Sequence, residues 1–424
     1  MNFIEELRWR GLLFDSTPGT EEHLNTGMRS GYVGFDPSAP SLHIGSLVQI
    51  MLLVHFQRAG HKPIALVGGA TGMIGDPSGK SEERKLLNEE TIRGYAEKIK
   101  IQLSRFLDFG SSGNAASLEN NYEWFREIKV LDFLRDVGKH LTVNYMMAKD
   151  SVKSRLESGI SFTEFSYQLL QGYDFYWLNQ HRDCTMQMGG SDQWGNIVAG
   201  IELTRRKSGN ELFAVTSQLI MRADGKKLGK TEEGAVWLDA AMTSPYKFYQ
   251  YWINVTDEDA AKYIRYFSLL SKEEIDAIEA AHALEPGKRY LQQKLAEDIT
   301  VRVHSREDYD AAVRASGILF GKSTGDDLHS LSNRDFEEIF EGVPTKKLSK
   351  SLFENGIDVM KLLVDDTQFF PSKGEARRTI ESRGAAVNKQ TISLDYIVKS
   401  EQLINNRYLV LQKGKKNYFL VIAE

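Results

Sequence analysis

The clearest pattern near the start of the chain is a short apolar segment, a turn and a longer apolar segment, within residues 32–60. The first segment is rich in strand formers, and Pro37 ends it because proline has no N–H group to pair with a neighbouring strand. The nearly unbroken apolar run 47–56 predicts a buried helix that Gly60 terminates. The pattern therefore predicts a strand, a tight turn and a helix N-terminus, where exposed N–H groups and the helix dipole favour a phosphate.

Later segments repeat this alternation of strand and helix. The apolar stretch 64–67 predicts a buried strand that runs into a glycine-rich segment. Residues 186–196 predict a strand that ends in two glycines, at 189 and 190, and runs into a helix. Helices are predicted by periodic apolar positions at residues 3–9, 82–109, 130–137, from 161 onward and throughout 257–320. From about residue 357 the pattern changes to a small module with a helix at 371–380 and a terminal hairpin at 408–421. The order of elements is typical of an α/β domain with a parallel sheet, an all-α domain and a small α+β module.

Composition narrows the class of protein. The chain has 424 residues, which is too long for one hydrophobic core, so two or three domains are expected. Hydrophobic residues make up 41% and charged residues 26%, which is ordinary for a soluble globular protein. The single cysteine, Cys184, excludes an intramolecular disulfide and a cysteine-rich zinc site, and it suits a reducing cytoplasm. The first residues do not form a signal peptide, and no apolar run is long enough to span a bilayer.

Charge is distributed unevenly along the chain. The net charge is −5, but residues 371–424 contain ten Lys and Arg against five Asp and Glu, a balance of +5. The remainder of the chain therefore carries about −10. A basic terminal module on an acidic body indicates either an anionic partner or a solvated basic face, and charge alone leaves both open.

A motif containing a histidine follows the first predicted strand. The segment is Tyr32-Val33-Gly34-Phe35-Asp36-Pro37-Ser38 and, after a turn, His43-Ile44-Gly45-Ser46. By itself, a histidine at a helix start is more often a cap than a catalytic group. The whole motif resembles the first signature of class I aminoacyl-tRNA synthetases, usually spelled HIGH, and its first part resembles the tyrosyl branch of that family.

The resemblance implies that this motif binds ATP. The residues that it assigns to ATP here are Gly34, Asp36, Ser38, His43 and Gly45, with His43 and Ser46 also assigned to catalysis. Ser46 stands where the usual signature has a second histidine. Its short, neutral side chain replaces only part of the donor function of a histidine, so we expect a slower activation step or compensation elsewhere.

The glycine-rich segment 68–80 is open to two interpretations. Residues 71–75 resemble the cofactor loop of a short-chain dehydrogenase, and Tyr145 with Lys149 has the Y-x-x-x-K spacing of that family. The order of elements argues against a dehydrogenase, because its glycine loop follows the first strand, whereas here a complete strand–helix unit comes before it.

In tyrosyl synthetases the same position carries GDPSGK, which is the sequence of residues 75–80. That resemblance implies that Asp76 binds the amino group of tyrosine, and that Lys80 and Arg84 lie on a loop facing the phosphates. The residues alone leave a second possibility, in which Asp76 only caps the turn before Pro77.

The helix predicted to begin at Ser161 carries a polar stripe. Ser161 and Glu164 have the spacing of a capping box. Tyr167, Gln171 and Asp174 lie at positions i, i+4 and i+7 and therefore share one face. The residues expected to pack on the other faces are Phe162, Phe165, Leu169, Leu170 and Tyr173. A polar stripe faces either solvent or a polar pocket, and solvent more usually selects Lys and Glu.

By resemblance, this stripe forms the pocket for the amino acid. Tyr167 and Gln171 would hold the ammonium group of tyrosine together with Asp76. Asp174 would accept a hydrogen bond from the phenol, and Tyr32 would pair with the same hydroxyl. Such a pocket disfavours phenylalanine, because buried polar groups would then be left without partners.

Two later motifs complete the resemblance. In the segment GGSDQWGN, at residues 189–196, Gly190 and Asp192 would bind the ribose of adenosine, and Gln193 would lie along the tyrosyl adenylate. The segment KLGKT, at residues 227–231, matches the second class I signature, usually spelled KMSKS. The residues of that loop expected to stabilise the departing phosphates are Lys227, Lys230 and Thr231, with Lys230 also counted as an ATP ligand.

The basic terminal module resembles the S-four type of RNA-binding domain. The side chains expected to bind RNA phosphates are Arg377, Arg378, Lys413, Lys415 and Lys416. The family organisation then implies a Rossmann-like catalytic domain at 1–235 with an inserted segment at about 118–152, a helical domain at 236–325, a linker at 326–356 and the RNA-binding domain at 357–424. The inserted segment would supply a dimer interface and part of the contact with the tRNA acceptor end.

Together these resemblances cover essentially the whole chain and imply a tyrosine–tRNA ligase. It would activate L-tyrosine with ATP to tyrosyl adenylate and pyrophosphate, and then transfer tyrosine to the terminal ribose of tRNA(Tyr). Magnesium is expected with ATP but without a fixed protein cage, and a tightly bound cofactor or a membrane partner is not expected. The family implies a cytoplasmic homodimer. The alternative is a catalytically weakened relative that acts as an RNA-binding protein; a tryptophan-specific relative is disfavoured by Tyr32 and Asp174.

Overall fold

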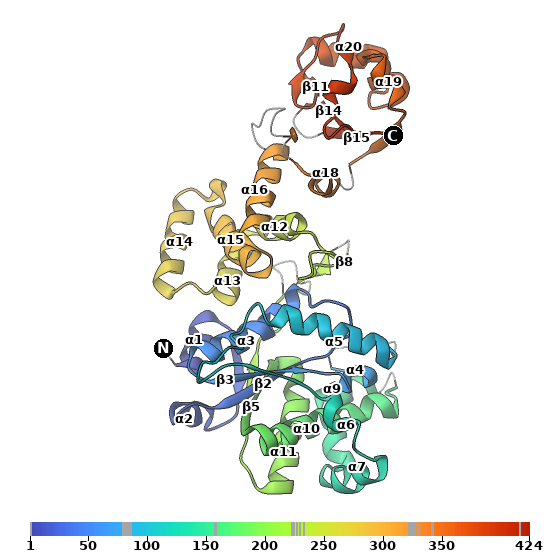
Figure 1. The fold of residues 1–424 in the computed structure, drawn as a ribbon. Helices are drawn as coiled ribbons and strands as arrows, with labels where there is room; N and C mark the ends of the chain where they lie inside the picture. The colour runs from blue at the N-terminus through green and yellow to red at the C-terminus, as the bar shows by residue number, and fades with distance from the viewer. Residues whose placement is uncertain are drawn as a thin grey trace. The chain divides into compact units, whose positions relative to one another are not determined.

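The computed structural model divides the chain into two compact units (Figure 1). One unit comprises residues 1–243 and 252–303, and the other comprises residues 244–251 and 304–424. The structure describes residues 2–78, 87–156, 159–221, 225, 228, 230–231, 234–320, 328–329, 331–340, 343–414 and 417–424. Within these residues, no helix has both the length and the apolar character needed to cross a bilayer.

A six-stranded sheet forms the centre of the first unit, in the order β1-β6-β5-β2-β3-β4. Its strands are β1 (Leu13–Ser16), β2 (Ser30–Phe35), β3 (Lys62–Val67), β4 (Ser117–Asn120), β5 (Cys184–Gly190) and β6 (Phe213–Ser217). All neighbouring pairs are parallel except β1 with β6. The predicted α/β fold with a parallel sheet is confirmed, and the predicted strands 64–67 and 186–190 lie in β3 and β5.

The strand order reverses between β2 and β5. From β2 the chain proceeds through β3 to β4 on one side, and then returns to β5 and β6 on the other. In open α/β sheets such a reversal leaves a crevice at the carboxyl ends of the two strands, and ligands bind there. The topology therefore places the first motif after β2 and the GGSDQWGN motif after β5 at one common edge.

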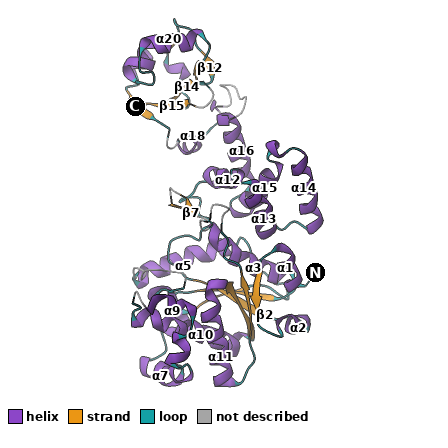
Figure 2. Ribbon diagram, turned by 180° about the vertical axis from the view of Figure 1, so that it is seen from behind, coloured by secondary structure: helices purple, strands orange, loops and turns teal. Residues whose placement is uncertain are grey.

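Helices cover both faces of this sheet (Figures 1 and 2). Helices α3 (Leu47–Arg58) and α5 (Glu89–Leu103) lie on one face, and α10 (Phe162–Arg182) and α11 (Trp194–Ser208) lie on the opposite face. The apolar run of α3 is buried almost throughout, as its sequence predicts. The helix predicted at 82–109 is shorter than expected, because residues 104–109 form turns and Gly110 N donates to Asp108 Oδ1 at 2.8 Å; residues 79–86 lie outside the described part of the chain.

The segment between β4 and α10 is made of short helices. These are α6 (Tyr122–Phe125), α7 (Val130–Asp136), α8 (Val143–Met147) and α9 (Asp150–Leu156). Residues 118–120, which the sequence assigned to an insertion, belong to the edge strand β4. Large apolar side chains from this segment are exposed, namely Val130, Leu131, Leu134, Val143 and Met147. Phe162, the first residue of α10, was expected to pack but is 77% exposed, and this prediction was wrong.

Three further helices complete the first unit: α13 (Asp257–Phe267), α14 (Lys272–Leu284) and α15 (Tyr290–Val303). Arg10, in α1 (Phe3–Arg10), is only 2% exposed and ties α1 to the end of α13. Its guanidinium donates to the carbonyl oxygens of Arg265 (2.8 Å), Ser268 (3.0 Å) and Leu270 (2.7 Å). The Arg265 carbonyl belongs to the last turn of α13 and the other two follow the end of this helix, where backbone acceptors lack partners within the helix.

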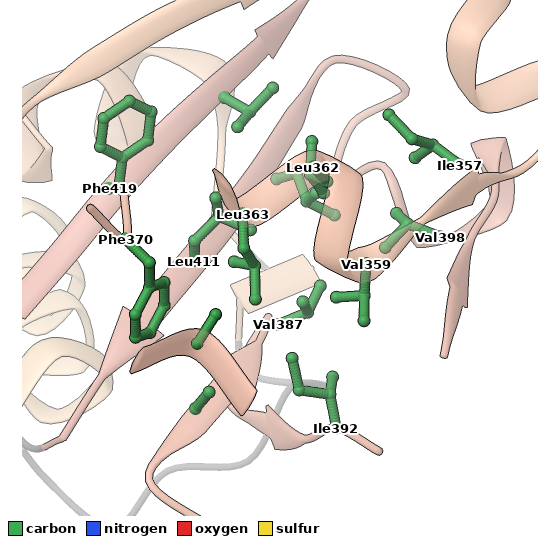
Figure 3. Close-up of a cluster of buried hydrophobic side chains, with 14 of the residues drawn as sticks. Ile357, Val359, Leu362, Leu363, Phe370, Val387, Ile392, Val398, Leu411 and Phe419 are labelled. Carbon is green, nitrogen blue, oxygen red and sulfur yellow. The ribbon is translucent and has the colours of Figure 1, made fainter. Parts of the chain in front are cut away.

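The second unit contains α16 (Arg306–Phe320), α18 (Asn333–Ile339) and an α+β module. The strands of this module are β9 (Thr345–Leu348), β11 (Ala385–Val387), β12 (Gln390–Thr391), β14 (Tyr408–Lys413) and β15 (Asn417–Ala423). The predicted hairpin is β14 with β15, and the predicted helix 371–380 is α20 (Lys373–Glu381). Figure 3 shows the hydrophobic core of the α+β module. Phe370, Leu411 and Phe419 belong there to one buried cluster with Leu362 and Val387.

Arg10→Met is expected to lower the free energy of unfolding by about 3 kcal/mol, because several buried carbonyl groups would lose a charged donor. Arg8→Met is the matched control on the same helix. Arg8 forms an exposed ion pair with Glu21 at 3.1 Å, and its loss should cost less than about 1 kcal/mol. Chemical denaturation of the full chain measures both, and equal losses would contradict the role assigned to Arg10.

Candidate active site

A cavity of about 320 Å³ lies at the carboxyl ends of β2, β3 and β5. It brings together many residues that the sequence predicted separately: Tyr32, Gly34, Asp36, Ser38, His43, Gly45, Ser46, Asp76, Tyr167, Gln171, Asp174, Gly190, Asp192 and Gln193 all line it. These residues come from segments spread over more than 150 positions of the chain. The reversal of strand order is what gathers them at one place.

The remaining predicted residues fall into three groups. Lys80, Arg84, Lys227, Lys415 and Lys416 lie outside the described residues. Lys230 and Thr231 form the short strand β7 (Lys230–Thr231), of which the backbone is described. Arg377, Arg378 and Lys413 belong to the α+β module of the second unit.

A buried carboxylate lies at one end of the cavity. Asp174 is 2% exposed, and its Oδ1 accepts a hydrogen bond from Trp124 Nε1 at 2.9 Å. Its Oδ2 accepts one from Asn121 Nδ2 at 3.0 Å. Burial raises the pKa of the Asp174 carboxyl well above its ordinary value, while these two N–H donors act in the opposite direction. The arrangement favours a further hydrogen-bond donor from a ligand.

Tyr32 lies beside this carboxylate. Burial raises the pKa of its hydroxyl well above the ordinary value, and the charge of Asp174 raises it further, so the hydroxyl stays protonated. Among the described residues, Tyr32 Oη has no hydrogen-bond partner although it is buried. Two other buried side-chain oxygens on the cavity wall, Gln171 Oε1 and Gln187 Oε1, also lack partners there. Buried polar atoms without partners are uncommon, which indicates that a polar ligand completes them.

A hydrogen-bond network connects Asp174 to the first motif. Asn121 Nδ2 also lies 2.9 Å from Thr71 Oγ1, which donates to Asp36 Oδ1 at 2.7 Å. The hydroxyl of Tyr167 donates to Asp36 Oδ2 at 2.7 Å. Burial, followed by the charge of Asp36, raises the pKa of Tyr167 well above its ordinary value. Tyr167 therefore remains a donor, and Asp36 is held from two sides.

Asp76 caps the turn before the end of its segment and also borders the cavity. Its Oδ1 accepts from the backbone N–H of Ser78 at 2.9 Å, which caps the turn. Its Oδ2 accepts from Gln193 Nε2 at 2.7 Å on the cavity side. Asn196 Nδ2 lies 3.3 Å from Asp76 Oδ1 and 3.2 Å from Ser78 Oγ. The carboxylate is thus fixed in orientation at the wall of the cavity.

His43 precedes a short 3-10 turn, Ile44–Ser46, that leads into α3. Its ring atom Nδ1 accepts from the backbone N–H of Gly45 at 3.0 Å, so the histidine is a cap as well as a cavity residue. A Cβ atom at Gly45 would lie 2.7 Å from the His43 ring, which only glycine avoids. Ser46 lines the cavity one residue later, without a side-chain capping bond.

Backbone hydrogen bonds join the first signature segment to residues 236–238, which closely follow the second signature segment. Ile44 N donates to Val236 O at 3.0 Å, and Leu238 N donates to Leu42 O at 2.8 Å. The rings of His43 and Trp237 lie 6.1 Å apart, edge to face. β7 pairs with β8 (Gly234–Ala235), which directly precedes this bridge. The loop that carries the KLGKT sequence is therefore anchored next to His43.

Several functional positions were missed from the sequence. Thr71, Asn121, Trp124, Gln187 and Asn196 contribute side chains to the site or to the residues that line it. Asn121 and Trp124 precede their partner Asp174 by 53 and 50 positions, so no local spacing reveals them. Thr71 lies in the glycine-rich segment 68–80, so the sequence placed it in a loop near the site but did not indicate a role for its side chain.

One sequence prediction requires correction, and the structure agrees with the rejection of the dehydrogenase alternative. Ser161 Oγ accepts from Glu164 N at 3.1 Å, but the return bond of a capping box is replaced, because Arg155 binds both carboxylate oxygens of Glu164 at 2.9 and 3.0 Å. Tyr145 and Lys149, the pair considered for a dehydrogenase, form a cation–π contact at 3.8 Å and do not line the cavity. Within the described residues, no group of three or more His, Cys, Asp or Glu side chains could hold a metal ion.

Comparison with known proteins identifies the family. The family described as tRNA synthetases class I (W and Y) matches residues 25–321. The chain belongs to this family. A second family, the tyrosine–tRNA ligase SYY-like C-terminal domain, matches residues 335–421.

Full-length relatives carry the same description. The chain is 58% identical over 430 residues to a tyrosine–tRNA ligase of Porphyromonas gingivalis, covering 100% of both chains. It is 58% identical over 422 residues to that of Cytophaga hutchinsonii, covering 99% of each. Among solved structures, a C-terminally truncated mitochondrial tyrosyl-tRNA synthetase of Coccidioides posadasii matches with a TM-score of 0.65 and 31% identity, over 74% of this chain and 91% of that one.

These findings confirm the family predicted from the sequence. They also confirm the prediction of an ATP-dependent tyrosine–tRNA ligase with a C-terminal module of the RNA-binding type. They give no support to the alternative of a weakened relative that only binds RNA. The roles assigned to individual residues remain predictions.

Gly68→Ala is expected to lower the free energy of unfolding by about 2 kcal/mol, because its Cβ would lie 2.0 Å from Asp36 Oδ1 and 2.4 Å from Thr71 Oγ1. Both atoms are held in the hydrogen-bond network, so neither can move away freely. Gly94→Ala on α5 is the control: no atom lies within 4 Å of its Cβ, and the change should be neutral or stabilising by up to about 1 kcal/mol. Denaturation curves that coincide for the two variants would refute this account of Gly68.

Proposed function

We propose that this chain activates L-tyrosine with ATP in the cavity described above, and then transfers the tyrosyl group to the 3′-terminal ribose of tRNA(Tyr). The observation that carries the proposal is the polar end of the cavity. It contains both the buried Asp174 carboxylate, held by two N–H donors, and the unpartnered hydroxyl of Tyr32. An apolar ring without a hydroxyl would leave both groups unsatisfied.

Tyrosine would be held at its two ends. The phenol hydroxyl donates to Asp174 and pairs with Tyr32. The ammonium group is bound by the carboxylate of Asp76, the hydroxyl of Tyr167 and the unpartnered Gln171 Oε1. Four carboxylates, those of Asp36, Asp76, Asp174 and Asp192, border the cavity, so a cationic ammonium group is electrostatically favoured.

ATP would lie across the first motif and the GGSDQWGN motif. Gly34, Asp36, Ser38, His43 and Gly45 line one side of the cavity. Gly190 and Asp192 line the other side and would bind the ribose, with Gln193 along the adenylate. The tyrosine carboxylate attacks the α-phosphate, and pyrophosphate leaves. Neither this activation step nor the later transfer to tRNA needs a covalent enzyme intermediate. Catalysis therefore consists of positioning the reactants and of stabilising negative charge on the phosphates.

Positive and polar groups would stabilise the phosphates. His43 and Ser46 lie on the cavity wall, and the loop residues assigned to the same task are Lys80, Arg84, Lys227, Lys230 and Thr231. Magnesium would accompany ATP and neutralise part of the phosphate charge. The short β7–β8 pairing beside His43 gives the second signature loop a fixed base from which it can close on the phosphates.

The α+β module would bind tRNA. Arg377 and Arg378 are exposed on α20. Lys413 is partly committed within the module, because its ammonium group forms an ion pair with Glu375 and lies 5.0 Å from the ring centroid of Phe370. With Lys415 and Lys416, these residues would bind phosphates, and the affinity should fall with salt. We place the protein in the cytoplasm, where its proposed substrates occur and where a free thiol such as that of Cys184 stays reduced.

A second copy of the chain would pack on the exposed apolar residues between β4 and α10. Val130, Leu131 and Leu134 of α7 are 73%, 79% and 48% exposed, and Phe162 is 77% exposed. Exposed large apolar residues concentrated in one segment are typical of an interaction surface. A homodimer would bury them.

The proposed activity is tested by tyrosine-dependent exchange of pyrophosphate into ATP. The parent chain should catalyse exchange with tyrosine and not with phenylalanine. Asp174→Leu should raise the KM for tyrosine by roughly 10- to 100-fold, because a charge-assisted hydrogen bond is lost. A chain that binds tRNA but shows no exchange would instead support the RNA-binding alternative.

Leu131→Asp is expected to convert the dimer to a monomer, since it places a charge in an apolar interface. Ile101→Asp is the control, because Ile101 is also apolar and 62% exposed but lies on α5. Analytical ultracentrifugation of both variants and the parent gives the mass directly. A monomeric parent, or a dimer unaffected by Leu131→Asp, would exclude this interface.

A further inference from the structure

Three aromatic rings form a continuous stack that starts at the phenol end of the cavity. The rings of Trp124 and Trp177 are 4.1 Å apart with an interplanar angle of 14°, and those of Trp177 and His181 are 4.3 Å apart at 15°. The guanidinium of Arg182 lies 5.2 Å from the ring centroid of Trp177. The stack runs from the buried indole of Trp124 to the exposed side chain of His181.

The second and third rings of the stack, those of Trp177 and His181, come from the same helix as the Asp174 carboxylate. Asp174, Trp177 and His181 lie at positions i, i+3 and i+7 of α10, so one face of this 21-residue helix carries all three. His181 is tied to the stack a second time, because its Nδ1 lies 2.9 Å from the carbonyl oxygen of Trp177. The helix therefore presents the carboxylate and, one turn later, a flat aromatic surface.

Trp124 comes from a much weaker element. It lies on α6, which has four residues and no side-chain cap at its N-terminus. A helix this short is not stable by itself, so contacts with other elements determine its orientation. Trp124 lies in a buried cluster that also contains Phe175 and Leu178, and the contact that lies flat against its ring is the stack on Trp177.

The plane of that ring determines a hydrogen bond. Trp124 Nε1 lies in the plane of the indole and donates to Asp174 Oδ1 at 2.9 Å. Hydrogen bonds weaken steeply when the donor tilts away from the acceptor. Rotation of the indole would therefore weaken this bond without moving Asp174 itself.

We propose that Trp177, supported by His181, is a positioning residue that holds the Trp124 indole N–H on Asp174 and thereby sets the affinity for the phenol of tyrosine. This inference rests on the proposed function, in which Asp174 accepts the phenol hydroxyl. Trp177 itself does not line the cavity and acts only through Trp124.

The position of the Trp124 N–H donor also affects the pKa of the Asp174 carboxyl. Burial raises the pKa of Asp174, the Asn121 and Trp124 donors oppose the rise, and the charge of Asp36 adds to it. The other titratable groups near the carboxylate are the hydroxyls of Tyr32, Tyr167 and Tyr173, whose pKa values are themselves raised by burial. A loosened Trp124 donor would raise the pKa of Asp174 further. The carboxylate would then protonate at a higher pH, and tyrosine affinity would be lost at a higher pH as the solution is acidified.

The test measures the KM values for tyrosine and ATP by pyrophosphate exchange, from acidic to neutral pH. Trp177→Leu should raise the KM for tyrosine by roughly three- to tenfold, the value of one aromatic stack, with the KM for ATP unchanged. The acid limb of the tyrosine profile should move to higher pH. Trp177→Phe, which keeps a flat ring, should restore most of the affinity, and His181→Ala, at an exposed position, should shift both readouts in the same direction but less.

Tyr176→Leu is the matched control. Tyr176 neighbours Trp177 on α10 and is also half-buried, but it packs in a different cluster, with Val137, Leu141 and Met146. It should leave the KM for tyrosine and its pH profile unchanged. Thermal unfolding of each variant verifies that it is folded.

Parental values in Trp177→Leu and His181→Ala would overturn the inference. So would equal losses in Trp177→Leu and Tyr176→Leu, or a rise in the KM for ATP that matches the rise for tyrosine, because these indicate general loosening of α10. If the parent binds tyrosine by equilibrium dialysis but shows no exchange, the proposed function fails alone, and dialysis of the same variants decides the inference. A parent that does not bind tyrosine overturns both.

Discussion

The burial of one carboxylate is the constraint on which the site depends. Taking Asp174 out of water is costly unless its oxygens receive hydrogen bonds. Two donors, Asn121 and Trp124, are supplied by the segment after β4, whereas the carboxylate is supplied by α10. The short segment and the long helix must therefore pack in one particular way before any ligand arrives. In the proposed function, such a site would favour a phenol over a phenyl ring, because only the phenol would provide partners for the groups that burial has left available.

The same hydrogen bonds connect the two ends of the cavity. From Asp174 the network passes through Asn121 and Thr71 to Asp36, which also receives the hydroxyl of Tyr167. A residue of the first motif is thus held by residues of the amino-acid pocket. The glycines of the segment after β3 make this possible, since a side chain at Gly68 would occupy the space of the Asp36 carboxylate. In the proposed function, this network would therefore position the amino acid and the nucleotide together.

The phosphate end is organised differently. There the backbone, and not a side-chain network, connects the two signatures, through the bridge between Leu42–Ile44 and Val236–Leu238. This backbone bridge fixes the segment that directly follows the loop carrying KLGKT. In the proposed function, the loop would contact the phosphates at the same edge of the sheet at which tyrosine is bound.

Local signals were sufficient for much of this description. The alternation of strand, glycine turn and helix predicted the parallel sheet, and the spacing of Tyr167, Gln171 and Asp174 predicted a polar face, because both patterns repeat over a few residues. Other features depended on the order of strands in the sheet, which no short repeat encodes. That order brought Asn121 and Trp124 to an acceptor about 50 positions later. The tertiary structure also pairs Glu164 with Arg155 in place of the return bond of a capping box. A buried carboxylate is stabilised more by a guanidinium than by a backbone N–H.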